Sequence, residues 1–365
     1  MITGSASDVD YTDTLRHAIE VNASDVHVQV GSSPRVRVNS ELRPTPFPVA
    51  QADHIDQFLR RVMPPERYDE YTTTGDADFS LAVDGLGRFR GNAFRQRGGP
   101  AFVLRRVLPS AVSAQQLGLP DVVTRLANEQ RGMVLVTGPT GSGKTTTLAA
   151  MVDHINQSRS ARIITIEDPI EVIHLDKRSV VAQREIGTDT TNYAQAMRRA
   201  LRQDPDVILI GEMRDAETVE TALGAAETGH LVLSTLHTTN AVETINRIVS
   251  FFPPHQHGQI RLTLAAVLRG VVSQRLVQTV SGRDRVAAIE AMVVDGRIVQ
   301  RIIDPTSGDE SIEEIVATGG YSGSQSFDQA LVELFKAGTI SLDAALAASS
   351  NPHDVQVKLK SAGLV

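Results

Sequence analysis

The stretch Gly138-Pro-Thr-Gly-Ser-Gly-Lys-Thr-Thr146 decides the fold of this 365-residue chain. It matches the pattern G-x-x-x-x-G-K-[ST], with Gly138, Gly143, Lys144 and Thr145 in the specified positions. Glycines allow successive backbone N–H groups to turn toward phosphate oxygens, and the lysine adds a point charge for the β- and γ-phosphates. In such loops the threonine hydroxyl is a ligand for Mg²⁺. The residues predicted to bind the nucleotide phosphates are Gly138, Pro139, Thr140, Gly141, Ser142, Gly143, Lys144, Thr145 and Thr146.

The sequence on both sides of this loop fits a strand–loop–helix unit. Residues 132–138 form a short apolar run bounded by glycines, which is typical of a buried parallel strand. Residues 145–156 have helical spacing, and a helix there directs its positive end at the phosphates. The alternative is a chance glycine-rich turn before a helix, which does not explain why strand, loop and helix occur together.

Composition narrows the class of protein. Hydrophobic residues make up 41% of the chain, so a large core can form, and 365 residues suffice for two domains. The absence of cysteine excludes disulfides, cysteine-ligated zinc and thiol chemistry. A formal net charge of −7 argues against general nucleic-acid binding. Residues 1–8 lack the features of a signal peptide, and no apolar run approaches the ~18 residues of a membrane-spanning helix, so we expect a cytoplasmic protein.

Local patterns predict two domains joined by a linker. Residues 1–108 combine short helices with alternating strands and predict an α+β domain. Residues 109–120 are rich in turn formers and predict a linker. From 121 to 365, alternation of strands and helices predicts an α/β domain with a parallel, doubly wound sheet and a helical C-terminal tail. Long helices are expected over 240–250 and 254–276.

Carboxylates follow two of the expected strands in this second domain. Glu167, Asp168 and Glu171 come after the apolar run 162–166, and Glu212 comes after the run 206–210. Ligands of open α/β sheets bind beyond the carboxyl ends of the strands, where acids hold Mg²⁺ or polarise an attacking water. The alternative for the first group is a solvated acidic turn. The expected metal ligands are Thr145, Glu167 and Glu212.

Two histidines, His230 and His237, flank the apolar run 231–236 at opposite ends. A histidine close to a γ-phosphate would sense its presence, and the alternative is a structural histidine with satisfied ring nitrogens.

Arginines are concentrated on the last strands expected in the first domain. They are Arg88, Arg90, Arg95, Arg97, Arg105 and Arg106. A solvated strand face is the ordinary explanation. The functional alternative is that one or two of them, with Arg97 and Arg105 as candidates, reach a nucleotide phosphate in a neighbouring subunit.

With these motifs in place, the chain resembles the secretion ATPase superfamily, and within it the type IV pilus retraction ATPases (PilT-like). The resemblance covers nearly the whole chain and lies in five segments that occur in the family's order. They are Ala23–Val28, the loop Gly138–Thr146, the acidic box Ile166–Glu171, the Walker B segment Leu209–Asp215 and the histidine box Glu227–Thr238.

The resemblance implies a PAS-like N-terminal domain, a RecA-like ATPase domain and a homohexameric ring with ATP bound between the two domains. It implies that Glu171 is the catalytic base, that Glu212 is the second acid and that His230 and His237 line the nucleotide site beside the catalytic Lys144. The implied function is an ATP-hydrolysing motor for pilus retraction and twitching motility. Such a motor acts at the inner face of the cell membrane, peripheral to it, on an inner-membrane pilus platform protein.

Two features bear on the subfamily. Extension-type relatives carry a tetracysteine module that this cysteine-free chain lacks, which favours retraction. Retraction ATPases share a C-terminal A-I-R-N-L-I motif, whereas the corresponding residues here read Gly296-Arg-Ile-Val-Gln-Arg-Ile302, with the arginine displaced. The open alternatives are an extension or accessory secretion ATPase, a RecA-like nucleic-acid translocase and a nucleotide-binding regulator without turnover.

Overall fold

The computed structural model describes residues 11–38, 41–107, 110–282 and 284–364. It divides into two compact units. The first comprises Met1–Pro109 and Glu171–Ile173, and the second comprises Ser110–Ile170 and His174–Val365. Pro109, with which the expected linker begins, lies outside the described residues, and Ser110 groups with the second unit.

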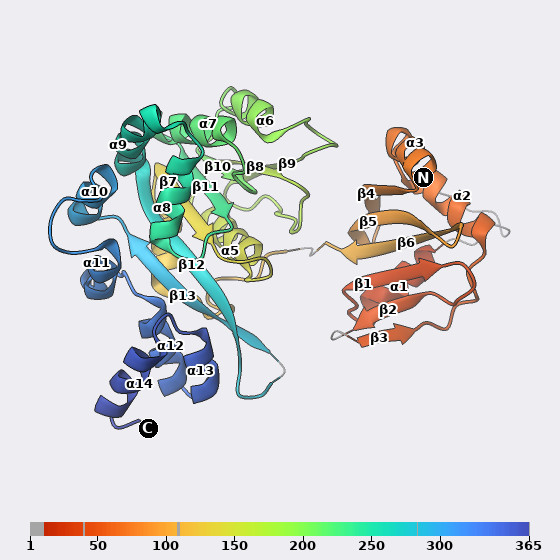
Figure 1. Ribbon diagram of the computed structural model, residues 1–365. Helices are drawn as coiled ribbons and strands as arrows, with labels where there is room; N and C mark the ends of the chain where they lie inside the picture. Colours follow the sequence, from red (N-terminus) through yellow and green to blue (C-terminus); the bar gives the residue numbers. More distant parts are fainter. Residues whose placement is uncertain (1–10, 39–40, 108–109, 283, 365) are drawn as a thin grey trace. The chain divides into compact units, whose positions relative to one another are not determined.

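The first unit is a six-stranded antiparallel sheet in the order β3-β2-β1-β6-β5-β4 (Figure 1). Its strands are β1 (Asp25–Gln29), β2 (Arg35–Val38), β3 (Glu41–Pro44), β4 (Asp76–Val83), β5 (Gly87–Gln96) and β6 (Gly99–Arg106). Its helices are α1 (Thr12–Glu20), α2 (Ala52–Val62) and α3 (Pro65–Thr74). Apolar side chains from all three helices pack on one face of the sheet in a single core, because alternate strand residues point to that face. The predicted α+β class of this region is confirmed.

The second unit is built on a seven-stranded sheet in the order β13-β12-β7-β11-β10-β8-β9. Its strands are β7 (Gly132–Thr137), β8 (Arg162–Glu167), β9 (Val180–Glu185), β10 (Val207–Ile210), β11 (Leu231–Leu236), β12 (Leu268–Gln278) and β13 (Arg285–Val293). All neighbours pair in parallel except β12 and β13, which form an antiparallel hairpin. The predicted α/β class with a RecA-like domain is confirmed.

Helices cover both faces of this sheet, as expected of a parallel sheet that is buried on both sides. They are α4 (Asp121–Ala127), α5 (Lys144–Ser158), α6 (Tyr193–Ala200), α7 (Ala216–Glu227), α8 (Ala241–Ser250), α9 (His257–Val267), α10 (Gly296–Ile303) and α11 (Ile312–Thr318). Along β7, Val134 and Val136 join the core beneath α4 and α5, whereas Met133 and Leu135 join the core on the opposite face. This alternation sets the face of the sheet that each β7 residue joins, and the phosphate loop begins after Thr137, where β7 ends.

Smaller elements complete the second unit. Helices α12 (Phe327–Lys336), α13 (Leu342–Ala348) and α14 (Pro352–Ser361) form the predicted helical tail, and short 3-10 turns lie at η1 (Pro254–Gln256) and η2 (Gly320–Ser322). Among the described residues, no helix has the length and apolar character needed to cross a membrane.

The expected helix over 254–276 is wrong in its second half. Helix α9 ends at Val267, and Leu268 begins β12, which pairs with β7 on one side and β13 on the other. Both faces of β12 are buried along most of its length, so its residues do not alternate between buried and exposed positions, and periodicity alone does not separate such a strand from a buried helix.

Candidate active site

The phosphate loop lies at the carboxyl end of β7, which is an inner strand of the sheet between β11 and β12. Gly138 has φ 145° and Gly143 has φ 89°, both in the region that favours glycine. A Cβ on Gly138 would lie 2.5 Å from the carbonyl oxygen of Gln274, so no larger residue fits there. Gly143 is the N-cap of α5, and the loop therefore leads directly into the positive end of that helix.

Lys144 is buried, with 9% of its surface exposed. Its Nζ donates hydrogen bonds to the carbonyl oxygens of Gly138 at 2.8 Å and Pro139 at 3.1 Å. These contacts hold the ammonium group inside the curve of the loop, where it adds positive charge to the backbone N–H groups. Thr145 follows in the first turn of α5 and is half-buried.

The side chain of Ser142 supports an anion site in the loop. Its Oγ is buried and has no hydrogen-bond partner among the described residues. A buried hydroxyl normally finds a partner, and a phosphate oxygen in the loop would provide one. The residues of the loop therefore fit a nucleotide phosphate.

Glu212 and His237 lie at the same edge of the sheet as the loop. Strands β11 and β10 are the next two after β7, and their carboxyl ends lead to His237 and Glu212. Neighbouring strands are ~4.8 Å apart, so the two residues lie roughly one and two strand spacings to the side of the loop. The Nε2 atom of His237 is 3.2 Å from Oε1 of Glu212, so the structure brings these two predicted residues together.

Arg214, which the sequence analysis did not single out, also contacts Glu212. Arg214 Nη2 lies 2.8 Å from Oε2 of Glu212, opposite the oxygen that faces His237. Burial raises the pKa of Glu212, but the guanidinium of Arg214 and the ring of His237 outweigh burial and place its pKa below the ordinary value. Glu212 is therefore held as a fixed negative charge. Arg214 is only two residues beyond Glu212, and this spacing was the available signal.

Glu167 ends β8, one strand beyond β10. Its Oε1 accepts hydrogen bonds from Thr165 Oγ1 at 2.6 Å and Gln183 Nε2 at 3.1 Å. Gly211 N donates to Ile166 O at 2.8 Å, which ties the Walker B turn to the end of β8. Glu167 and Glu212 are thus on the same edge of the sheet, on neighbouring strands.

His230 is placed apart from the loop of its own chain. It precedes β11, and its carbonyl oxygen accepts a hydrogen bond from Gly132 N at 2.9 Å, where β7 begins. Its Nδ1 is 2.9 Å from the carbonyl oxygen of Ala225. The full length of a six-residue strand, roughly 20 Å, separates this end of the sheet from the phosphate loop. The structure does not bring His230 together with His237.

Three further predicted residues belong to the first unit. Glu171 groups with that unit, and Arg90 Nη1 lies 3.1 Å from its Oε1. Arg105 Nε lies 2.7 Å from Oδ1 of the buried Asp25, so part of its charge is used within the sheet. Arg97 has φ 49° and occupies the turn between β5 and β6.

Fold and site define a P-loop ATP-binding protein of the RecA-like class. Residues 7–325 match the model of the family "Type II/IV secretion system protein", and the chain belongs to this family. It is 40% identical over 346 residues to "Type IV pilus retractation ATPase PilT" of Pseudomonas aeruginosa, which covers 95% of this chain and 100% of the relative. It is 36% identical to "Type IV pilus ATPase PilU" of the same species, covering 96% of this chain and 92% of the relative.

Solved structures agree with the sequence comparison. The crystal structure of "the Pilus Retraction Motor PilT and Bound ADP" superposes with a TM-score of 0.88 at 43% identity, covering 96% of this chain and 100% of that one. The ATPase DotB of Legionella pneumophila has a TM-score of 0.74 at 28% identity, covering 94% and 96%. The predicted family is therefore confirmed.

We expect Lys144→Ala to weaken ATP and ADP binding at least tenfold and to abolish turnover, because the loop loses the charge that its carbonyls hold in place. Isothermal titration with ADP measures the affinity. Lys336→Ala is the matched control, since Lys336 pairs with Glu333 on the exposed surface of α12. An ADP affinity equal to that of the parent protein would contradict the assignment.

Proposed function

We propose that this chain is an ATP-hydrolysing motor that powers type IV pilus retraction and so supports twitching motility. The observation that carries the proposal is the convergence of the phosphate loop, His237 and Glu212 at one edge of the sheet in a member of this family. The similarity to a pilus retraction ATPase over the whole of that relative's length supports it.

The proposed assembly is a homohexamer at the inner face of the cell membrane, acting on an inner-membrane platform protein. Its domains are a PAS-like domain over 1–108, a linker over 109–120 and a RecA-like domain over 121–365. Arg97 and Arg105 of one subunit are proposed to reach a nucleotide phosphate bound by a neighbour.

The side chains present fit Mg²⁺-ATP. When bound, the magnesium ion neutralises charge that develops on the phosphate oxygens. Thr145, Glu167 and Glu212 supply hydroxyl and carboxylate oxygens, which are the donors that Mg²⁺ prefers. Among the described residues, no group of three or more histidines or acids forms a metal site on its own, and Mg²⁺ in such proteins is held by one or two side chains together with phosphates.

The remaining roles follow from chemistry and position. Lys144 and the loop N–H groups are proposed to orient the β- and γ-phosphates, and His237 is proposed to contact the γ-phosphate. Glu171 is proposed to accept the proton of the attacking water. Glu212, held ionised between Arg214 and His237, is proposed to serve the metal or to orient that water.

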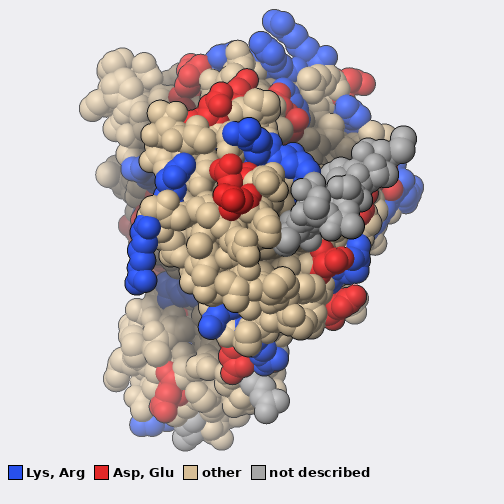
Figure 2. Space-filling view, turned by 90° about the vertical axis from the view of Figure 1, so that its right-hand side faces the viewer, with Lys and Arg blue, Asp and Glu red and all other residues tan. Residues whose placement is uncertain are grey.

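Surface charge favours the motor over a nucleic-acid translocase. On the face drawn in Figure 2, cationic and anionic side chains are interspersed. A nucleic-acid channel needs clustered basic residues, and the chain as a whole carries a net charge of −7.

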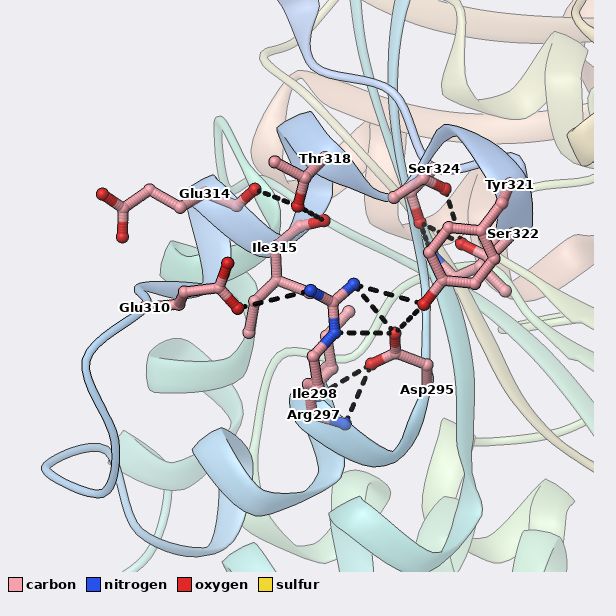
Figure 3. A network of polar contacts seen from close by, with 12 residues as sticks. Asp295, Arg297, Ile298, Glu310, Glu314, Ile315, Thr318, Tyr321, Ser322 and Ser324 are labelled. Carbon is pink, nitrogen blue, oxygen red and sulfur yellow. Dashed lines mark hydrogen bonds and ion pairs between the residues drawn. The ribbon is translucent and has the colours of Figure 1, made fainter.

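An accessory role is the second candidate, and α10 is the observation that favours it. This helix occupies the position of the A-I-R-N-L-I motif, but its first-turn residue Arg297 is engaged by Asp295, Glu310 and Tyr321 (Figure 3). Asp295 also caps the helix through the backbone N–H groups of Arg297 and Ile298. The chain thus has a well-formed α10 with a different polar surface, and it is also similar to PilU.

We expect this protein to restore twitching in a strain lacking its own retraction ATPase if retraction is its function. If the unmodified protein hydrolyses ATP but fails to restore twitching, the motif on α10 is the first candidate cause. Grafting A-I-R-N-L-I onto 297–302 requires Arg297→Ala, Val299→Arg, Gln300→Asn and Arg301→Leu, and it keeps the buried Ile298 and Ile302. The graft should then restore movement with ATP turnover unchanged. Failure of both forms, with turnover intact, would favour the accessory role.

We expect Glu171→Gln and Glu212→Gln to retain ADP affinity but to lower kcat by about 10²–10⁴-fold, the usual contribution of a positioned acid or base. Steady-state phosphate release measures kcat. Glu217→Gln on α7 is the control, because Glu217 is exposed and pairs only with Arg198 in the ion pairs described. Turnover of Glu171→Gln within a few-fold of the parent would remove Glu171 from the role of base.

We expect ATP turnover per chain to fall on dilution, since Arg97 and Arg105 are proposed to act on a neighbour's nucleotide. Light scattering at each concentration reports the assembly state. Constant turnover down to monomeric concentrations would refute the arginine contribution across subunits.

A further inference from the structure

Strand β12 carries two buried polar side chains between apolar ones. Ser273 is 0% exposed and Gln274 is 1% exposed, whereas Val271, Val272 and Val277 on the same strand are apolar and buried. A polar group in a core is costly unless it has hydrogen-bond partners. Both side chains have partners, and all of these lie in or beside the phosphate loop.

The two residues hold the loop at both of its ends. Thr137 Oγ1, at the end of β7, donates to Ser273 Oγ at 2.9 Å. Gln274 Nε2 donates to the carbonyl oxygen of Ser142 in the loop. Gln274 Oε1 accepts from Thr147 Oγ1 at 2.9 Å, in the first turn of α5. One amide side chain therefore bridges the loop and the helix that follows it.

The close approach of β12 also explains two glycines of the loop. The carbonyl oxygen of Gln274 would lie 2.5 Å from a Cβ on Gly138, and its Nε2 would lie 3.0 Å from a Cβ on Gly143. The loop is thus packed directly against Gln274, with no room for an intervening side chain at these two points.

We propose that Gln274 is a positioning residue for nucleotide binding, which holds the loop in the form that presents its N–H groups to phosphate. The inference rests on the proposed nucleotide site but adds a determinant that lies outside the loop motif, 128 residues after it in the sequence (274 − 146). Gln274 acts through Ser142 and Thr147 and needs no contact with the phosphates. Without this bridge the loop occupies other conformations, and the apparent affinity for nucleotide falls in proportion to the fraction of loops that remains competent.

The decisive variant is Gln274→Met, which keeps the length of the side chain and removes both hydrogen bonds. If the competent fraction falls to about a tenth, ADP affinity falls about tenfold. The KM for ATP should rise by a similar factor while kcat changes by less than about twofold, because binding rather than the chemical step is affected. Isothermal titration with ADP and steady-state kinetics of the full chain measure these values.

Variants of the partner residue test the same bridge from its other end. Thr147→Val removes one hydrogen bond and leaves the one to Ser142, so its loss of ADP affinity should be smaller than that of Gln274→Met. Thr147→Ser keeps the hydroxyl and should bind ADP as the parent does. Gln278→Met is the matched control on the same strand, since Gln278 is exposed and contacts Gly282 in the hairpin turn.

If Gln274→Met has the ADP affinity and the KM of the parent protein, the inference is overturned. This holds even if the melting temperature without nucleotide falls, because a lower melting temperature with unchanged binding indicates a residue that only stabilises the fold. If Gln274→Met does not fold, equal ADP affinity of Thr147→Val and Thr147→Ser would overturn it instead. A parent that binds ADP without hydrolysing ATP would refute the proposed motor function and would leave the affinity series as a valid test of Gln274.

Discussion

The parallel pairing of β7 with β11 on one side and β12 on the other is the constraint on which the second unit depends. Because β7 is hydrogen-bonded to β11 on one side and to β12 on the other, the residue that ends it is fixed, and the phosphate loop begins there. The β11 side brings His237 and, through β10, Glu212 to the loop. The β12 side brings Ser273 and Gln274 against it. A slip of one residue would exchange the two faces of β7 and displace all of these groups.

Local chemistry explains what was predictable from sequence. The loop, its strand and its helix depend on residues within a short stretch, so the pattern of glycines, Lys144 and apolar residues suffices to predict them. Glu212 and His237 were predictable because each lies within two residues of the end of a short apolar strand, and the carboxyl ends of parallel strands meet on the same side of the sheet. The antiparallel strands of the first unit alternate in burial, which leaves a clear period of two, as in β5.

Long-range pairing explains what was not predictable. The pairing of β12 with β7 turned an expected helix into a strand, and the same pairing makes Gln274 a neighbour of a loop more than 120 residues earlier. The polar residues Ser273 and Gln274 between valines and leucine of β12 were the visible signal, but nothing local shows what they contact. His230 belongs to the same histidine box as His237, but the six-residue strand β11 lies between them. The two histidines are therefore at opposite ends of that strand. A shared motif therefore does not imply a shared site.

The surroundings of Glu212 also separate the roles of the two acids. An efficient general base near neutral pH has a pKa close to the working pH, and for a carboxylate this requires a pKa raised well above its usual range. Arg214 and His237 act in the other direction and lower the pKa of Glu212. A carboxylate held ionised in this way is a poor proton acceptor but a good ligand for a cation or an orienting acceptor for water. The contacts of Glu212 with Arg214 and His237 thus favour a role as fixed negative charge over a role as proton acceptor.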